Sequence, residues 1–304
     1  MGKVYRQQRV EGITIPAVIH NGNYFYTNMA IYEDGTVSCW HKSDLEQFKM
    51  DLEKGWVVSN VPIGVCLSVH GLGSFRICDA NWKYDKNSFY EHVNEVVRSL
   101  NPEMINIYHT TKREIEKWEK AHVRWSGSPT PCKLKEGFGY ELLDGEESRI
   151  FYRKNNKVYL TTITAYADKT FCIDIENGKI FSAEEIEQLF DDKILCTALK
   201  DKEWVMIEGL GDILLEEVDY EIPEIEKKKE IINMSYRAVG EPDVFEQCWK
   251  AHYAYLCEPS PYTKEALRKA YEAVPEHERM FLGDMDSRDY DFIRILETDE
   301  KREV

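Results

Sequence analysis

The chain has 304 residues, of which 43% are hydrophobic and 12% aromatic, a composition typical of globular domains and sufficient for two of them. Its formal net charge of −16 at pH 7 argues against direct binding to nucleic acids or anionic membranes, because both need clustered Lys and Arg. No apolar run approaches the roughly 20 residues that span a bilayer, and no apolar signal core follows the basic N-terminus. We therefore expect a cytoplasmic protein that does not bind membranes.

The residue types that usually hold metals or perform catalysis show no recognised spacing. The eight cysteines include no CxxC pair, and the histidines include no HxH, HExxH or HxxxH pair. Several cysteines, such as Cys39 and Cys196, lie inside apolar strand-like runs, where a thiol packs as a small hydrophobic group. We expect reduced structural cysteines, no metal ion and no cofactor, and the sequence gives no positive evidence for catalytic residues.

The first part of the chain predicts a hairpin, a helix and short strands. Residues 23–32 are typical of a strand, and Asp34-Gly35 is a strong hairpin turn. A helix capped by Ser43 follows, with apolar residues at helical spacing. Further strands are expected at residues 56–58, 65–69 and 75–78, with Gly71-Leu-Gly73 before the last of them.

The same order of elements returns after residue 157, which indicates an internal duplication. Tyr32 and Tyr166, in matching Tyr-x-Asp-x-Thr turns, are 134 positions apart, and the Gly-Leu-Gly corners at Gly71 and Gly209 are 138 apart. Between them, Leu45-Glu-Gln-Phe48 matches Ile186-Glu-Gln-Leu189 at an offset of 141. These offsets predict a longer turn before the second helix, which starts with a capping box at Ser182 and Glu185, and a shorter link after that helix.

The sequence therefore predicts an α+β fold of two tandem related modules, each with an antiparallel sheet and helices, and a C-terminal helical extension. The clearest boundary is Ser126-Gly-Ser-Pro-Thr-Pro131, where two prolines and a glycine preclude regular structure. We expect a first module at residues 1–125, a Pro/Gly-containing linker at 126–150, a second, duplicated module at 151–257 and the extension at 258–304. Helices are expected in the extension at residues 262–273 and 290–296.

The two Gly-Leu-Gly corners allow a structural and a functional interpretation. A tight link between antiparallel strands explains the glycines most simply, since neither corner continues into a phosphate-binding motif. The functional alternative is a nucleotide or small-ligand site between the repeats, with or without catalysis, in which the residues before the corners form an acid–base pair. That site would be lined by His70, Gly71, Gly73, Glu208, Gly209 and Gly211.

A dense acidic stretch near the C-terminus consists of Asp284, Asp286, Asp289 and Asp291. The stretch does not fit a calcium-binding EF-hand, because Asp289 stands where the loop needs Gly and Ile295 where it needs Glu. A solvated turn is one interpretation, and an electrostatic contact for a basic partner is the other.

One predicted helix carries more aromatic residues than one face can bury. Trp249, Tyr253 and Tyr255 point to different sides of it. At least one ring is therefore left for an interface, where Trp and Tyr contribute much of the binding energy.

Taken together, these features favour a non-enzymatic protein that binds and inhibits a larger protein partner, such as a basic nucleic-acid-processing complex. Immunity proteins of bacterial toxin systems and phage inhibitors of host defence complexes are acidic, motif-poor and aromatic-rich in the same way; for a phage protein the cytoplasm would be that of a bacterial host. We also expect a homo-oligomer that assembles through the extension. The expected partner-binding residues are Trp249, Tyr253, Tyr255, Asp284, Asp286, Asp289 and Asp291.

Overall fold

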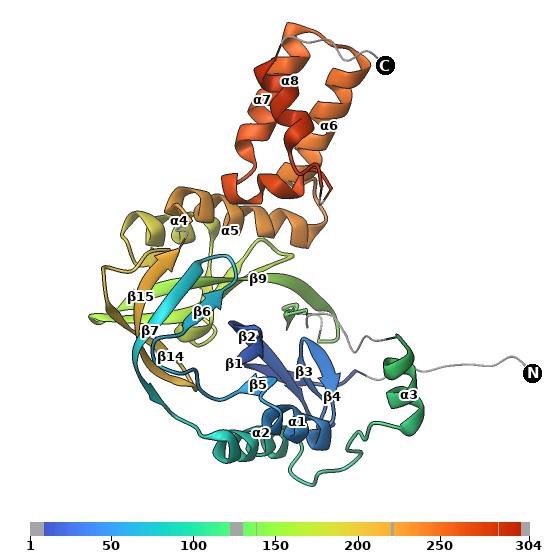
Figure 1. Ribbon diagram of the computed structural model, residues 1–304. Coiled ribbons are helices and arrows are strands. Elements are labelled where there is room, and N and C mark those ends of the chain that lie inside the picture. Colours follow the sequence, from blue (N-terminus) through green and yellow to red (C-terminus); the bar gives the residue numbers. More distant parts are fainter. Residues whose placement is uncertain (1–8, 122–129, 138, 220–221, 285, 299–304) are drawn as a thin grey trace, which may run out of the picture. The chain divides into compact units, whose positions relative to one another are not determined.

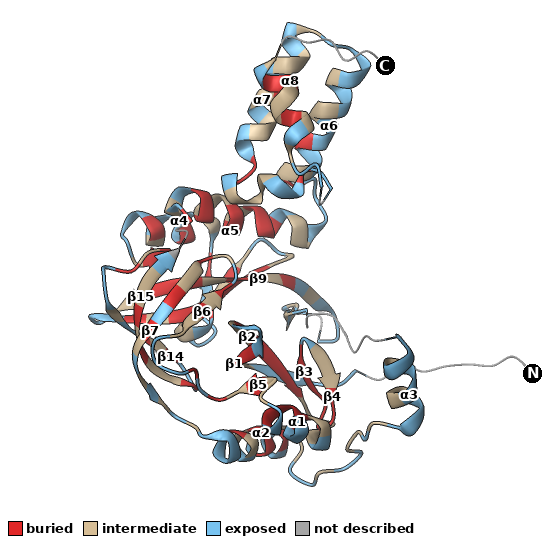
Figure 2. Ribbon diagram, viewed as in Figure 1, coloured by how far each residue is buried: buried red, intermediate tan, exposed pale blue. Residues whose placement is uncertain are grey.

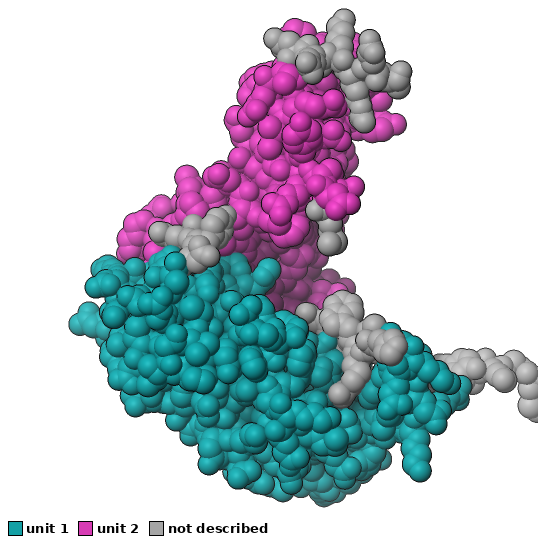
Figure 3. Space-filling model, in the orientation of Figure 1, with its two compact units in different colours: residues 1–129, 154–160, 199–220 teal, residues 130–153, 161–198, 221–304 magenta. Residues whose placement is uncertain are grey.

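The computed structural model describes residues 9–121, 130–137, 139–219, 222–284 and 286–298, and it combines helices with strands (Figure 1). The chain forms two compact units (Figure 3). Unit 1 comprises residues 1–129, 154–160 and 199–220, and unit 2 comprises residues 130–153, 161–198 and 221–304. No helix in the described ranges has both the length and the apolar character needed to cross a bilayer.

Unit 1 is a sheet with helices. Its strands are β1 (Gly12–Asn21), β2 (Asn23–Tyr32), β3 (Val37–Cys39), β4 (His41–Ser43), β5 (Val57–Val58), β6 (Cys66–Val69), β7 (Gly73–Trp82), β14 (Glu203–Ile207) and β15 (Gly211–Asp219). Its helices are α1 (Leu45–Glu53), α2 (Lys86–Leu100) and α3 (Lys112–Ala121). The strand order is β14-β15-β7-β6-β2-β1-β5, and the core includes Phe48 of α1 and Phe89 of α2.

Unit 2 contains most of the second copy and the C-terminal helices. Its strands are β8 (Cys132–Leu134), β9 (Leu142–Lys154), β10 (Lys157–Tyr166), β11 (Phe171–Ile173), β12 (Ile180–Phe181) and β13 (Leu195–Cys196), and β9 and β10 also have residues in unit 1. The α-helices are α4 (Ala183–Asp191), α5 (Glu224–Val239), α6 (Val244–Cys257), α7 (Pro261–Ala273) and α8 (Tyr290–Glu297). Two short 3-10 helices are η1 (Asp174–Glu176) and η2 (Glu276–Phe281).

The structure confirms the predicted α+β fold with two related modules. In the first copy β2 pairs with β1, β3 and β6, and in the second copy β10 pairs with β9, β11 and β14. The pairing of β2 with β6 and that of β10 with β14 are both parallel. Both Tyr-x-Asp-x-Thr turns are closed by the same bond, since Tyr32 N donates to Thr36 O and Tyr166 N to Thr170 O, each at 2.9 Å.

The predicted helix alignment of the two copies is wrong by three residues. The buried residues Phe48 and Leu52 of α1 correspond to Ile186 and Phe190 of α4, an offset of 138 instead of 141. A shift of three residues is close to one helical turn of 3.6, so it returns a similar pattern to the same face. The longer turn before α4 is confirmed, because η1 lies in it. The predicted shorter link after α4 is wrong, because the offset stays at 138 through β7 and β15.

The helix caps show one further difference from the sequence prediction. Asp44, not Ser43, is the N-cap of α1, and the Ser43 hydroxyl instead donates to Asp51 at 3.1 Å. The capping box at Ser182 and Glu185 is confirmed at the start of α4.

Two of the expected boundaries lie elsewhere in the structure. The predicted linker at residues 126–150, of which 126–129 and 138 lie outside the described residues, contains β8 and the first part of β9. Gly145 marks a close strand contact there instead of a loop, because a Cβ at this position would lie 2.9 Å from the Tyr166 ring. At the other boundary, α6 was expected in the second module, but its Cys248 shares a buried core with Leu267 of α7 and Phe292 of α8. The helical extension therefore begins with α6.

The cysteines that the sequence placed in strands act as packing groups. Cys39 and Cys196 are buried, and so is Cys248 in α6. Burial raises the pKa of both Cys39 and Cys248 to about 12, which keeps these thiols protonated at neutral pH.

The Gly-Leu-Gly corners are hairpin links, as the structural interpretation predicted. The first joins β6 to β7 and the second joins β14 to β15. Leu72 and Leu210, between the glycines, are fully buried. Gly209 and Gly211 have φ angles of +85° and +151°. A Cβ on Gly211 would lie 2.6 Å from the backbone oxygen of Asn81, whereas one on Gly209 would meet no atom within 4 Å.

These two glycines provide a matched test of the corner. Gly211→Ala combines an unfavourable φ with a clash against the backbone of β7, so we expect it to lower the free energy of unfolding by about 3 kcal/mol or more. Gly209→Ala adds only the backbone cost, about 1 kcal/mol. Urea unfolding of both variants measures the difference, and equal losses would show that the contact with β7 does not constrain the corner.

Candidate functional site

The residues expected to line a ligand cleft between the repeats are not brought together. β7 pairs with β15 in antiparallel register, so that Gly211 lies opposite Trp82 at the other end of β7 from Gly73. β7 is 10 residues long, which corresponds to about 30 Å. His70 and Glu208, both exposed, belong to these separate corners. The structure contradicts a shared site, because antiparallel pairing places equivalent hairpin ends at opposite ends of the strand pair.

The acidic stretch near the C-terminus largely supports local structure. Asp284 Oδ1 accepts from the backbone N–H of Asp286 at 3.0 Å and so closes a turn. Asp289 accepts from the hydroxyl of Tyr271 at 2.6 Å. Asp291 lies in the first turn of α8, where a carboxylate stabilises the helix dipole. Asp284 and Asp286 are exposed, so the solvated-turn interpretation accounts for most of this stretch.

The three aromatic residues expected at an interface have different environments on α6. Tyr253 is 71% and Trp249 is 46% exposed. Tyr255 instead packs against the core formed with α7 and α8. Trp249 is held in place, because its Nε1 donates to the carbonyl of Leu282 at 2.8 Å. Trp249 and Tyr253 are therefore available to a partner, and Tyr255 is mainly structural.

A larger apolar surface surrounds these two rings. Phe245, Trp249, Tyr253 and Leu256 recur at helical spacing on α6 and form what we call the aromatic stripe. Leu256 is exposed and Phe245 is half-buried, and Figure 2 shows how much of α6 is exposed or intermediate. The 3.6-residue periodicity was present in the sequence. Only the structure shows that Phe245 packs against the helix core, whereas Trp249, Tyr253 and Leu256 stay exposed.

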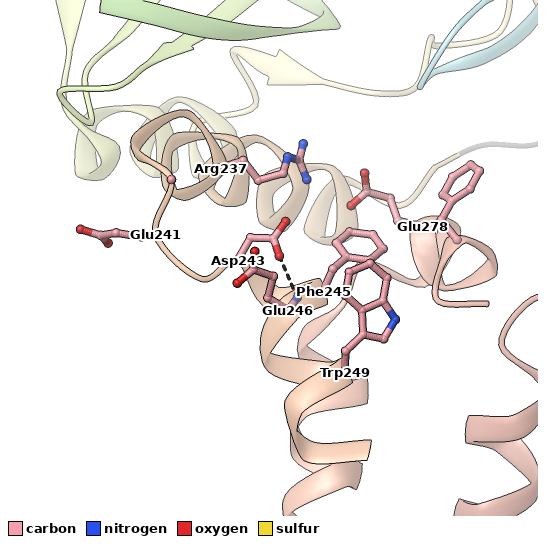
Figure 4. A pocket seen from close by; sticks show the side chains of 9 residues that line it. Arg237, Glu241, Asp243, Phe245, Glu246, Trp249 and Glu278 are labelled. Atoms are coloured by element: carbon pink, nitrogen blue, oxygen red, sulfur yellow. Dashed lines mark hydrogen bonds between the residues drawn. The ribbon is translucent and has the colours of Figure 1, made fainter. Parts of the chain in front are cut away.

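A pocket of about 490 Å³ lies at the start of the stripe, between the end of α5, the start of α6 and η2 (Figure 4). Phe245 and Trp249 form an aromatic wall, with ring centroids 6.2 Å apart. The pocket carries four carboxylates but a single cationic side chain, Arg237, whose Nε donates to Glu146 at 2.8 Å. We call it the acidic pocket; its lining residues are Arg237, Gly240, Glu241, Asp243, Phe245, Glu246, Trp249, Glu278 and Phe281.

Behind the pocket, α5 contains a buried ion pair. Lys227 is completely buried, and its Nζ lies 2.8 and 3.0 Å from the two carboxylate oxygens of Glu230. It also donates to the Ser148 hydroxyl at 2.7 Å, which in turn donates to Glu230 at 2.7 Å. Burial lowers the pKa of Lys227, and the Glu230 carboxylate opposes that effect. Three acceptors around one nitrogen match the three N–H donors of a charged ammonium.

The same carboxylate binds η2. His277 Nε2 lies 2.8 Å from Glu230 Oε2. Burial alone would raise the pKa of Glu230, but bonds from His277, Lys227 and Ser148 outweigh it and lower this pKa. The neighbouring Glu278 shows the opposite: burial, and then the charge of Glu230, raise its pKa. We call Ser148, Lys227, Glu230, His277 and Glu278 the buried polar cluster.

Comparison of the two copies shows that the fold itself does not need this cluster. At the offset of 138, Phe89 of α2 corresponds to Lys227 and His92 to Glu230. Phe89 is buried, so the first copy fills the same helix position with an apolar ring. The Lys-Lys-Lys-Glu sequence at residues 227–230 is typical of a solvated helix face. Only the comparison with Phe89 of α2 could have indicated that Lys227 is buried. The second copy has therefore diverged toward a polar interior.

We expect Lys227→Met to lower the free energy of unfolding by about 3–5 kcal/mol, because it leaves the Glu230 charge buried without its ammonium. The double variant Lys227→Met with Glu230→Leu should recover part of this loss, since the Glu230 charge is then no longer buried without its ammonium. Lys250→Met is the control: its pair with Glu246 is exposed, and its loss should change stability by about 0.5 kcal/mol or less. Denaturant unfolding of each variant measures these changes in the free energy of unfolding. A double variant no more stable than Lys227→Met would contradict the assignment of Lys227 as the buried charge partner of Glu230.

Comparison with known proteins gives a family without a described activity. No curated protein and no solved structure shows a significant match to the chain. One family model, Domain of unknown function (DUF7638), matches residues 1–104 and 133–242, in two segments that agree with the tandem copies. A second, Domain of unknown function (DUF7639), matches residues 243–303 and begins where α6 begins. The second model thus matches the C-terminal helical extension. Since the first model covers more than half of the chain, the protein belongs to the DUF7638 family.

Proposed function

We propose that this protein is a non-enzymatic inhibitor that binds a larger, basic protein through the aromatic stripe and the acidic pocket. The partner segment would carry Lys or Arg beside an apolar side chain. The observation that supports this best is the juxtaposition of exposed aromatic rings with carboxylates on α6 and beside it.

The aromatic stripe has the composition of a binding hot spot. Trp and Tyr contribute large contact areas at a small entropic cost and dominate the energy of many interfaces. The Trp249 ring is already fixed by its bond to Leu282, so binding need not order it. Phe281 of η2 adds a further exposed ring at the pocket.

The charges around the stripe favour a cationic partner. Glu241 and Glu246 are exposed at the pocket, and the chain as a whole carries −16. Their pairs with Lys169 and Lys250 are exposed as well and can be exchanged for a partner's Lys or Arg at little cost. A cation next to Trp249 would also gain a cation–π contact. A nucleotide fits this pocket poorly, because four carboxylates repel its phosphates.

Inhibition of the partner, an immunity or anti-defence role and a cytoplasmic location are parts of the proposal that rest on the sequence profile alone. Homo-oligomerisation is likewise a prediction of the sequence, which the mass of the protein in solution would test. A second copy is a poor occupant of the stripe, because the same acidic residues would face each other.

The decisive experiment compares single-site variants in the capture of a partner from the native host. Tyr253→Ala removes a largely exposed ring, so it should weaken binding at least tenfold without changing stability. Glu246→Lys should slow association and reduce its dependence on salt. The readouts are the dissociation constant and the activity of the identified partner with and without the protein.

Tyr262→Ala is the matched control, since this Tyr is 83% exposed on α7 outside the stripe, and it should bind like the unmodified protein. If all three variants bound the same protein with the same dissociation constant as the unmodified chain, the proposed surface would be overturned. A partner whose activity is unchanged on binding would overturn the inhibitory role.

A further inference from the structure

Two buried atoms of the polar cluster lack a hydrogen-bond partner within the part of the chain that the structure describes. They are Nδ1 of His277 and Oε2 of Glu278. The His277 side chain is only 10% exposed, and neither atom faces bulk solvent. Buried polar atoms without partners are rare in native proteins and call for a physical explanation.

The hydrogen bonds of Glu230 determine what His277 can offer. An ionised carboxylate only accepts hydrogen bonds, so the His277 Nε2 that lies 2.8 Å from Glu230 must carry the proton. In the neutral ring, Nδ1 then presents a lone pair. An imidazole whose other nitrogen donates to a carboxylate is the usual arrangement of a metal-bound histidine.

We propose that Glu230, His277 and Glu278 form a binding site for a divalent transition-metal ion such as Zn²⁺, with His277 and Glu278 as direct ligands and Glu230 orienting the imidazole. Each of the three residues offers a ligand atom, and these atoms lie within 4.8 Å of one another. One imidazole and carboxylate oxygens suit Zn²⁺ or Mn²⁺, whereas Ca²⁺ takes six to eight oxygens.

A metal ion bound by both residues would give Nδ1 of His277 and Oε2 of Glu278 a partner, whereas a proton on Glu278 would serve only one of these atoms. Protonation of Glu278 would remove its buried charge, in agreement with its raised pKa, but it would leave Nδ1 of His277 without a partner. The Lys227 ammonium lies 2.8 Å from Glu230 and already balances its charge. The ion would therefore balance the charge of Glu278.

The site also has a route to solvent and a reason to occur in the second copy only. Glu278 lines the acidic pocket, so an ion could enter there and keep open coordination positions toward it. The first copy has Phe89 and His92 at the positions of Lys227 and Glu230, and η2 belongs to the C-terminal domain. The metal would thus bind to η2, and α5 would orient the His277 ligand through Glu230. This inference does not depend on the proposed partner binding.

The test uses the full-length chain with Zn²⁺ alone in isothermal titration calorimetry, and with Co²⁺ as a spectroscopic probe. We expect one ion per chain, a rise in thermal stability on binding and at least tenfold weaker binding in His277→Ala and in Glu278→Gln. Glu276→Gln is the matched control, because this exposed carboxylate lies in the same short helix and should leave binding unchanged.

Glu278→Gln keeps the size of the side chain, so it tests the ligand even if His277→Ala disturbs folding. Urea unfolding of each variant without metal measures that disturbance. The proposal is overturned if the unmodified chain binds no Zn²⁺, or if all variants bind it equally through surface carboxylates. Equal affinity for Ca²⁺ at the same residues would overturn the assignment to transition metals.

Discussion

The buried charge of Glu230 is the constraint around which unit 2 is organised. A carboxylate removed from water must be compensated by charge and hydrogen bonds, and three elements supply them: Lys227 from α5, Ser148 from β9 and His277 from η2. Satisfying this one group therefore connects the sheet of the second copy to the helical extension. It also fixes the proton of His277 and brings Glu278 into a place where its own charge is unfavourable.

The two copies of the duplicated module differ at the position of this cluster. The first copy keeps an apolar Phe89 where the second has Lys227, while turns, hairpin corners and helix lengths are maintained in both. Elements that recur, such as Leu72 and Leu210 in the Gly-Leu-Gly corners, are buried scaffold. The proposed chemistry and binding surface lie where the copies differ and in the C-terminal extension formed by α6, α7 and α8. The scaffold shared by the two copies thus accommodates a polar interior in one copy and an apolar interior in the other.

The two proposals use neighbouring but separate parts of the extension. The aromatic stripe is exposed on α6, and the buried polar cluster lies behind the acidic pocket, with Glu278 at the boundary between them. The stripe depends on apolar area and surface charge, both of which act through solvent-exposed contacts. The cluster depends on buried groups, whose interactions are stronger because little water screens them. Substitution of an exposed ring of the stripe, such as Tyr253, would therefore leave the cluster in place.

The sequence by itself determined the duplication, the Tyr-x-Asp-x-Thr turns, the capping box at Ser182, the Gly-Leu-Gly links and the helices near residues 262–273 and 290–296. All of these depend on hydrogen bonds and periodicity within a few residues. Only the tertiary structure decided the register of α4, the separation of the two Gly-Leu-Gly corners, the packing of α6 with α7 and α8, and the burial of Lys227. Each of these depends on which distant segments pair, and a charged residue has the same local pattern whether it faces water or a carboxylate 2.8 Å away.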